Sequence, residues 1–328
     1  MKIACLQGKD QLQRMFTSAH LEELGKWGEV AVNETSGWQM EEQLGQTIEG
    51  ADIAITSWGV SPLGAEVLDR APQLRLVLHA AGSVKPICSP AMWERGIRVA
   101  NATAALGRGV AETALGMTIA SLKDMWRLGQ ASRQGNWGRV SAVRELYGVR
   151  IGVVGAGMAG SHYIKLLQQF DVETVLYDPF VTAEKAGAMG ADKVTFEELL
   201  ATSDVISIHV PSLPETKHMF NESSFRRMKD DCILINTARG AVIDEAAFVK
   251  ELEQGRFFAC LDVTEPEPPA ANHRFRSLPN VVLTPHIAGS VNNGLQRVAR
   301  SILDDLEAFL AGKPMKGEVR EEELKLLA

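Results

Sequence analysis

Short apolar runs alternate with helical stretches along the whole chain, and this alternation constrains the fold more than any other feature of the sequence. Some runs, such as residues 151–154, are almost wholly apolar, which is typical of strands buried on both faces of a sheet. Strands that alternate with helices predict parallel sheets, and ligands of such doubly wound α/β sheets bind at the carboxyl ends of the strands. The expected strands are residues 1–6, 52–56, 74–79, 150–155, 172–177, 205–210, 232–236, 258–262 and 281–284.

The length of the chain predicts two domains, because 328 residues exceed what one core usually holds. A small-residue segment, residues 100–109, precedes a helical stretch from Val110 to about Gln130. Residues 284–286 follow the last strand and precede a final helix, from Asn293 to about Ala311. We interpret both segments as interdomain crossings, so that one domain is inserted into the other, and we expect the charged tail after Pro314 to be peripheral.

The composition is that of a globular protein, with 45% hydrophobic and 23% charged residues and a formal net charge of −7. No basic cluster stands out, which argues against nucleic acid or an anionic membrane as a partner. The start of the chain lacks the apolar core of a secretory signal, and no uncharged apolar stretch approaches the ~20 residues of a membrane span, so we expect a cytoplasmic protein. The four cysteines form no Cys-x-x-Cys pair and have no histidine at metal-ligand spacing, so we expect reduced thiols and no metal site.

A glycine-rich segment directly follows the expected strand 150–155 and opens a helical stretch, residues 161–170. It reads Gly155-Ala156-Gly157-Met158-Ala159-Gly160. In this context the first glycine permits a tight turn, the second lets backbone amides approach a pyrophosphate, and the third allows close helix packing. The phosphate charge then meets a helix N-terminus. A purely structural turn is the alternative, but the order of strand, glycines and helix predicts a dinucleotide-binding loop.

Asp178 ends the next expected strand, about 20 residues beyond the glycines. A carboxylate at this point can accept hydrogen bonds from ribose hydroxyls, and it repels a 2′-phosphate. No arginine follows Asp178 immediately to bind such a phosphate. The sequence therefore favours NAD over NADP as the cofactor, although neighbouring residues could compensate.

Three charged or titratable residues follow later strands of the same domain: Arg239, Glu267 and His286. A guanidinium forms paired hydrogen bonds with a carboxylate and can polarise a carbonyl group. An imidazole can exchange a proton with a hydroxyl group near neutral pH, and a carboxylate can orient it. Each residue alone has a simpler interpretation, as a surface arginine, a solvated loop carboxylate or a structural histidine. Their joint placement at strand ends predicts acid/base chemistry on a small carboxylate.

The order of these motifs resembles that of the D-isomer-specific 2-hydroxyacid dehydrogenases. The resemblance covers most of the chain and is strongest from about residue 111 to residue 289. It implies a Rossmann NAD-binding domain, residues 104–284, inserted into a flavodoxin-like substrate domain, residues 1–103 with 285–328. It also implies hydride transfer between nicotinamide and C2 of a D-2-hydroxy acid or its 2-oxo acid. The further motifs that carry it are His209-Val210-Pro211, Thr216, Asn236 to Gly240 and Pro285-His286.

By this resemblance, Arg239, Glu267 and His286 correspond to the catalytic arginine, glutamate and histidine of the family. Glu265 competes for the glutamate role, but the family's acid stands five residues after the strand-end aspartate, here Asp262, which selects Glu267. Asp262 is expected to point towards the nicotinamide end of the cofactor. The implied cofactor contacts are Gly155, Gly157, Met158, Ala159, Gly160, Asp178, Val210, Pro211, Thr216, Thr237, Ala238, Arg239, Asp262 and Gly289.

A small-residue turn, Ala81-Gly82-Ser83, ends an expected strand of the first domain. Its backbone amides could hold the substrate carboxylate opposite Arg239, and a plain strand-to-helix turn is the alternative. The family usually has an Asp-containing stretch after this glycine, whereas this chain continues Val84-Lys85-Pro86, so the identity of the substrate stays open. Lys85 is a candidate contact for a second anionic group of the substrate, and a solvated loop lysine is the alternative.

The sequence thus predicts an NAD-dependent oxidoreductase for a small 2-hydroxy or 2-oxo acid. The resemblance also implies a homodimer formed through the cofactor domain, where Trp126 and Trp137 could fill an interface or simply pack. Relatives that act on formate or phosphite are alternatives, but the formate branch carries glutamine where this chain has Glu267. An alternative from another class is an NADH-sensing binding protein or corepressor with little catalysis.

Overall fold

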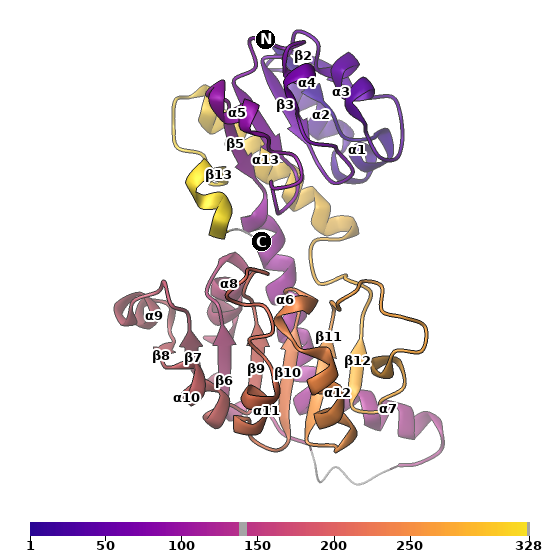
Figure 1. Ribbon diagram of the computed structural model, residues 1–328, viewed down its shortest axis with the longest axis vertical. Coiled ribbons are helices and arrows are strands. Elements are labelled where there is room, and N and C mark those ends of the chain that lie inside the picture. The colour runs from indigo at the N-terminus through magenta and orange to yellow at the C-terminus, as the bar shows by residue number, and fades with distance from the viewer. Residues whose placement is uncertain (138–142, 327–328) are drawn as a thin grey trace. The chain divides into compact units, whose positions relative to one another are not determined.

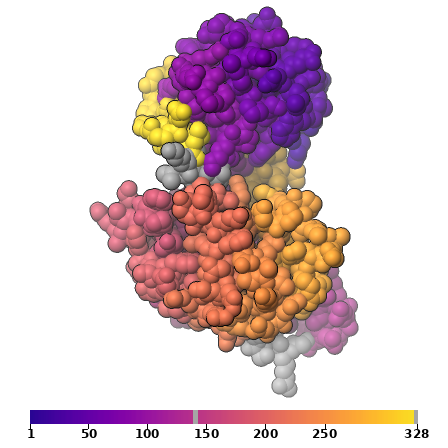
Figure 2. Space-filling model, viewed as in Figure 1, coloured from indigo at the N-terminus to yellow at the C-terminus, as the bar shows by residue number. Residues whose placement is uncertain are grey.

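The computed structural model describes residues 1–137 and 143–326 of the chain. These residues divide into two compact units. Unit 1 contains Met1–Leu106 and Ser290–Ala328, and unit 2 contains Gly107–Gly289. Figure 2 shows this division on the surface, because the indigo start and the yellow end of the chain lie in the same unit. The chain therefore leaves unit 1 after residue 106 and returns after residue 289, where the sequence led us to expect crossings after residues 103 and 284.

Unit 1 is built on a sheet in the order β13-β5-β4-β3-β1-β2, of which β1 to β5 are parallel (Figure 1). This order of the parallel strands is that of flavodoxin-like sheets. Apolar residues alternate between the two faces, so that Ile3 and Cys5 join one core cluster and Ala4 and Leu6 the other. The elements are β1 (Lys2–Cys5), α1 (Lys9–Met15), α2 (Ser18–Gly25), β2 (Glu29–Val32), α3 (Glu41–Ile48), β3 (Ile53–Thr56), α4 (Ala65–Leu68), β4 (Leu76–His79), α5 (Pro90–Glu94), β5 (Arg98–Asn101), α13 (Leu295–Leu310) and β13 (Glu318–Val319).

Unit 2 contains a parallel sheet in the order β12-β11-β10-β9-β6-β7-β8. From β8 to β11 this is the strand order of a Rossmann fold, with one further strand at the β12 edge. Core clusters cover the sheet on both faces. The elements are α6 (Thr103–Leu122), which begins in unit 1, α7 (Met125–Arg133), β6 (Tyr147–Val154), α8 (Met158–Leu167), β7 (Asp171–Tyr177), α9 (Ala183–Met189), β8 (Asp192–Lys193), α10 (Phe196–Thr202), β9 (Val205–Ile208), α11 (Glu222–Arg227), β10 (Cys232–Asn236), α12 (Glu245–Glu253), β11 (Phe257–Leu261) and β12 (Val281–Leu283).

The predicted fold class, two doubly wound parallel-sheet units, is confirmed, and each expected strand overlaps an observed one. The sequence missed β2, β5, β8 and β13. These strands are short, and β2 and β8 lie at sheet edges without a buried apolar run. The tail is not peripheral, because β13 pairs antiparallel with β5 and the side chains of Met315 and Val319 are buried.

The helix expected from Val110 to Gln130 was also wrong in its bounds. It begins at Thr103, so the small residues after β5 already belong to α6, and it breaks before α7. Asp124 lies at the break with a left-handed φ of 50°. No helix in the described ranges is both long and apolar enough to cross a membrane. In the same part of the chain, no three His, Cys, Asp or Glu side chains gather to hold a metal ion.

Candidate active site

The glycine loop lies where the connectivity of the unit 2 sheet reverses. β6 pairs with β7 on one side and with β9 on the other, and the chain runs from β6 through α8 to β7 before it crosses to β9. Such a switch point leaves a crevice beyond the carboxyl ends of the two central strands, where doubly wound folds bind nucleotides. The loop after β6 and His209, which follows β9, both lie at this place.

A side chain at each of the three glycines would meet a different environment. Gly155 has a φ of +93°, and a Cβ there would lie 2.8 Å from Cγ1 of Val210. A Cβ on Gly160 would lie 2.0 Å from the carbonyl oxygen of Gly155, so only glycine lets α8 begin this close to the loop. A Cβ on Gly157 would meet nothing within 4 Å. Gly157 is itself the N-cap of α8, so no side chain covers the first amides of this helix, which are groups of the kind that bind phosphate.

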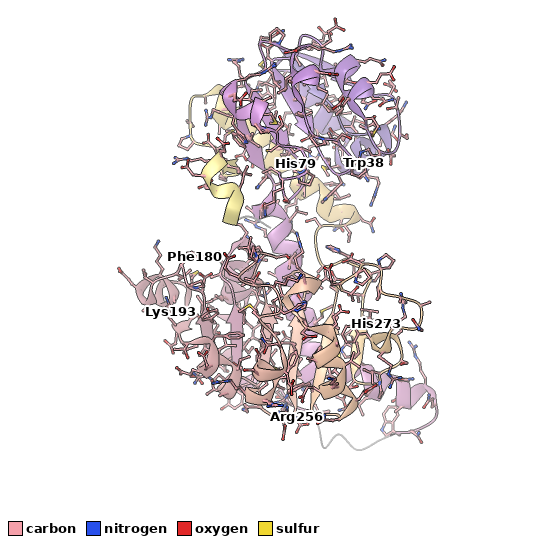
Figure 3. All side chains as sticks on the ribbon, in the orientation of Figure 1. Trp38, His79, Phe180, Lys193, Arg256 and His273 are labelled. Atoms are coloured by element: carbon pink, nitrogen blue, oxygen red, sulfur yellow. The ribbon has the colours of Figure 1, made fainter. Side chains whose placement is uncertain are left out.

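Asp178 directly follows β7 and is tied to the glycine loop. Its Oδ2 accepts from the Ala156 amide at 2.8 Å, and its Oδ1 accepts from the Phe180 amide at 2.8 Å. The carboxylate is half-buried, and each oxygen retains a second lone pair for another donor. Figure 3 labels Phe180, which marks this end of the sheet. The arrangement fits a carboxylate that accepts further hydrogen bonds from ribose hydroxyls.

The segment after β9 lies on the other side of the switch point. The His209 amide donates to the Val154 carbonyl at 2.8 Å, which holds this segment against the start of the glycine loop. The ring of His209 is buried beside Tyr163, and burial lowers its pKa to about 4, so it is neutral at pH 7. The hydroxyl of Thr216 donates to the Pro211 carbonyl at 2.6 Å, so this residue shapes its own loop.

Three adjacent strands carry the catalytic candidates at their carboxyl ends. Asn236, Leu261 and Leu283 lie side by side in β10, β11 and β12. The residues that follow them are therefore brought to one edge of the sheet. Asn236 shapes the first turn, because its Oδ1 accepts from the Ala238 amide at 3.0 Å and its Nδ2 donates to the Arg239 carbonyl at 2.9 Å.

His286 and Glu267, which the sequence predicted as an acid/base unit, lie within hydrogen-bond distance of each other. Nδ1 of His286 lies 2.6 Å from Oε1 of Glu267, and the two side chains are 49% and 40% exposed. If Nδ1 donates to the carboxylate, Nε2 of the neutral ring is left as the acceptor. His286 also has a left-handed φ of 53°, and its amide donates to the carbonyls of Asp262 and Thr284.

Asp262 fixes the loop that carries His286. The carboxylate is 1% exposed, and its Oδ1 accepts from the Thr284 hydroxyl and from the Ile287 amide at 2.9 Å. Its Oδ2 accepts from the Ala288 amide at 2.8 Å. These bonds were not expected from the sequence, which suggested only a contact with the cofactor; that contact stays a prediction. The buried carboxylate thus binds the side chain of Thr284 before His286 and the backbone amides of Ile287 and Ala288 after it.

Arg239 lies next to the loop that bears Glu267. Burial lowers the pKa of the guanidinium, and the negative charge of the Glu267 carboxylate opposes this effect. The two side chains therefore interact electrostatically. Arg239 Nη1 donates to the Ala238 carbonyl at 2.6 Å. A Cβ on Gly240 would lie 2.1 Å from the Thr264 carbonyl carbon, so only glycine lets the turn after β10 pack this closely on the Glu267 loop. The three catalytic candidates thus lie on neighbouring loops of unit 2.

The substrate-binding candidates Ala81, Gly82 and Ser83 follow β4 in unit 1. The Ala81 carbonyl accepts from the Ala102 amide at 3.0 Å, and the Gly82 carbonyl accepts from the Thr103 hydroxyl at 3.2 Å. The carbonyls of the turn are thus bonded within the chain. His79, labelled in Figure 3, ends β4 and lies 2.9 Å from the Thr56 hydroxyl, and burial lowers its pKa to about 4.

Two residues of the site were missed by the sequence analysis. Glu245 begins α12 and accepts from the Glu265 amide in the loop that carries Glu267, and His273, which ends that loop, lies 3.2 Å from the Glu245 carboxylate. An acidic residue just inside a helix N-terminus is common for electrostatic reasons alone, so the pattern gave no signal. Only the folded structure shows that Glu245 lies close to His273 and Glu265.

Comparison with known families gives one match over residues 115–288, to the NAD binding domain of the D-isomer specific 2-hydroxyacid dehydrogenases. This span covers the glycine loop and all three catalytic candidates.

Similar curated proteins carry dehydrogenase and reductase names. Glyoxylate reductase of Thermofilum pendens is 34% identical over 326 residues, which cover 97% of this chain and 96% of that protein. D-3-phosphoglycerate dehydrogenase of Archaeoglobus fulgidus is 33% identical over 292 residues, which cover 88% of this chain. This chain spans only 55% of the length of that relative.

Solved structures give the same result. The structure of a D-2-hydroxyisocaproate dehydrogenase is 27% identical, has a TM-score of 0.81 and covers 97% of this chain, with 99% of its own chain matched. Together, the matched NAD-binding domain and the relatives that align over nearly their whole length establish one conclusion. The chain belongs to the D-isomer specific 2-hydroxyacid dehydrogenase family.

Proposed function

We propose that this protein is an NAD-dependent dehydrogenase that interconverts a small D-2-hydroxy acid and its 2-oxo acid. The observation that carries the proposal is the 2.6 Å pair of His286 Nδ1 and Glu267 Oε1 at the carboxyl edge of a dinucleotide-type sheet. An oriented imidazole beside a nicotinamide site is what the transfer of a proton and a hydride to a carbonyl group requires.

His286 is the proton carrier in this proposal. During oxidation, Nε2 accepts the proton of the substrate hydroxyl group, and during reduction it returns that proton to the carbonyl oxygen. Glu267, bonded to Nδ1, holds the ring in the tautomer that leaves Nε2 free and stabilises the imidazolium ion that forms. A bound nicotinamide supplies or accepts the hydride at C2 of the substrate.

Arg239 and the turn in unit 1 are the proposed substrate-binding groups. The guanidinium stays charged, so it can pair with the substrate carboxylate and polarise the 2-oxo group. In unit 1, we propose the backbone amides of Gly82 and Ser83 as carboxylate-binding groups. The names of the relatives suggest glyoxylate, phosphorylated and branched-chain acids as candidate substrates.

The glycine loop and Asp178 are the proposed cofactor site. The open face over Gly157 and the first turn of α8 would bind the pyrophosphate, and Asp178 would bind the ribose. Because the Asp178 carboxylate repels a 2′-phosphate, we propose NAD over NADP. The remaining cofactor contacts proposed from the family are Met158, Ala159, Val210, Pro211, Thr216, Thr237, Ala238, Asp262 and Gly289.

The test is the oxidation of NADH against a panel of 2-oxo acids: glyoxylate, a phosphorylated three-carbon acid and a branched acid. We expect turnover of at least one acid, lowered ~10²–10⁴-fold in His286→Ala, which lacks the proton carrier. Arg239→Ala should mainly raise KM for the acid. NADH binding without turnover of any acid would contradict the proposal and would favour a binding protein.

We also propose that the chain forms a homodimer through unit 2. None of the residues of α7 is buried, and the side chains of Trp126 and Trp137 are 41% and 91% exposed. Large exposed aromatic side chains are typical of interaction surfaces. Light scattering should give twice the mass of one chain, and Trp126→Glu should shift it towards the monomer; a monomeric wild-type protein would contradict this proposal.

A further inference from the structure

We propose that Glu245 is a positioning residue for the acid/base pair, because it joins the two ends of the loop that carries Glu267. This loop, residues 264–273, is called the Glu267 loop below. The inference rests on the proposed function of Glu267 and His286. Glu245 acts on this pair through the loop, because its hydrogen bonds go to Glu265 and His273.

The carboxylate of Glu245 uses its two oxygens on opposite limbs of the loop. Oε1 accepts from the Glu265 amide at 2.8 Å, two residues before Glu267. Oε2 lies 3.2 Å from Nε2 of His273, the last residue of the loop. The side chains of Glu245 and His273 are only 13% and 23% exposed. One carboxylate therefore holds both limbs of the loop at one point.

The second nitrogen of His273 shows in which direction its bond runs. Nδ1 of His273 accepts from the Phe275 amide at 3.3 Å. The proton of the neutral ring then lies on Nε2, which donates it to Glu245. The ring also packs on Phe275, at 4.5 Å between centroids, and Phe275 is buried in the core of unit 2. His273, labelled in Figure 3, is thus a fixed anchor for the loop.

Other contacts hold single parts of the loop. The guanidinium of Arg276 donates to the carbonyls of Pro269 and Ala270, which fixes the outer bend. The Thr264 hydroxyl donates to the Pro266 carbonyl at 2.9 Å, which fixes the first turn. Neither contact links the first limb to the last. Glu245 makes this link from the rigid start of α12, where Asp244 caps the helix by accepting from the Ala247 amide.

The buried position of the Glu245 carboxylate would be energetically unfavourable without these two hydrogen bonds. Burial raises the pKa of its carboxyl group, the Glu265 amide opposes this effect, and the nearby Glu265 carboxylate adds to it. A buried carboxylate is retained where hydrogen bonds compensate its desolvation. Here both compensating bonds go to the Glu267 loop, so the rigidity of α12 is transmitted to the carboxylate that binds Nδ1 of His286.

The test is Glu245→Gln, which keeps the shape of the side chain. The amide oxygen can still accept from Glu265, but the NH₂ group then faces the Nε2 proton of His273, so the last limb is released. We expect kcat to fall on the order of tenfold. KM for the 2-oxo acid should stay nearly constant, because the turn that presents Arg239 is fixed by Asn236 instead.

Nuclear magnetic resonance of the unliganded protein gives a second readout that needs no substrate. The Nδ1 proton of His286, assigned by its loss in His286→Ala, should give a sharp low-field signal while it is bonded to Glu267. Glu245→Gln should broaden this signal by exchange with water. The matched control is Glu253→Gln on the same helix, which removes the 2.7 Å pair with Arg274 and should leave both the signal and kcat unchanged.

A double-variant comparison separates positioning from simple stability. If Glu245 acts through Glu267, Glu245→Gln should lower kcat in the wild type but not in a Glu267→Ala background. An equal loss in both backgrounds, or a sharp Nδ1 signal in Glu245→Gln, would overturn the inference. If Glu267→Ala and His286→Ala leave turnover unchanged, the proposed function fails, while the Nδ1 signal still tests the link. Should Glu245→Gln not fold, His273→Ala releases the same limb and gives the same readouts.

Discussion

Replacing Asp262 with asparagine keeps the shape of the side chain but removes one acceptor from the support of the His286 loop. In the protein, Oδ1 accepts from the Thr284 hydroxyl and the Ile287 amide, and Oδ2 accepts from the Ala288 amide. Asparagine loses least when its oxygen takes the Oδ1 position, because two bonds survive there. Its NH₂ group then faces the Ala288 amide, so two donors oppose each other.

The size of the effect follows from the burial of Ala288. This residue is 1% exposed, so water does not readily replace the lost acceptor. A hydrogen bond to a charged acceptor contributes ~1.5–3 kcal/mol. We expect the free energy of local opening at Ala288 to fall by about 2 kcal/mol, which speeds exchange of its amide hydrogen by roughly 30-fold.

Amide hydrogen exchange, read residue by residue by nuclear magnetic resonance, measures this change. Exchange at Ile287 should change less than at Ala288, because its bond survives. Asp244→Asn is the matched control: asparagine serves equally well as a helix N-cap, so exchange at Ala288 should stay as in the wild type. Unchanged exchange at Ala288 in Asp262→Asn, or equal acceleration at Ile287 and Ala288, would refute the reasoning.

Three further predictions concern the cofactor site and the buried histidines. Gly155→Ala is strained by its positive φ and by contact with Val210, so it should lower both the melting temperature and the affinity for NADH in calorimetry. Gly157→Ala should lower only the affinity. Equal melting temperatures of the two variants would contradict this prediction. Asp178→Asn should lower the ratio of KM for NADPH to KM for NADH by about tenfold. An unchanged ratio would show that Asp178 does not select the cofactor. Burial lowers the pKa of His79 and of His209 to about 4, below the usual histidine value of ~6.5. The stability that the neutral rings contribute is therefore complete above pH 6.5 and is lost as the pH falls towards 4. Unfolding by urea should therefore show about 2 kcal/mol less stability per histidine at pH 5 than at pH 7, and His209→Gln should reduce this slope.

The sequence predicted the central strands of both sheets because these strands are buried on both faces. An almost wholly apolar run such as residues 151–154 has few other places in a globular protein. The edge strands that were missed carry no such signal: β2 has no buried side chain, and β13 depends on its pairing with β5, far away in sequence. What sets these strands is their pairing with a neighbouring strand, which their own residues do not encode as an apolar pattern.

The catalytic candidates could be predicted from residue type and strand position. The residues that hold them in place could not be predicted in this way. The position of Arg239, Glu267 and His286 on adjacent loops follows from the register of β10, β11 and β12, and parallel sheets make that register nearly inevitable. The bond from Glu245 to the Glu265 amide has no counterpart in a motif. It depends on the path of a loop, which is decided by three-dimensional packing.

Asp262 and Glu267 are both carboxylates on the segment after β11, and their surroundings give them different tasks. Asp262 is buried and accepts three hydrogen bonds, from the Thr284 hydroxyl and the amides of Ile287 and Ala288, so it is held in place by the loop that carries His286. Glu267 is 40% exposed and its contact with Nδ1 of His286 is a single short bond, so the carboxylate can follow the ring as its charge changes. A buried acid that fixes the loop and a more exposed acid that pairs with the imidazole meet opposite requirements, rigidity and response. One carboxylate could not meet both, because the bonds that fix a buried carboxylate also prevent it from moving with the ring.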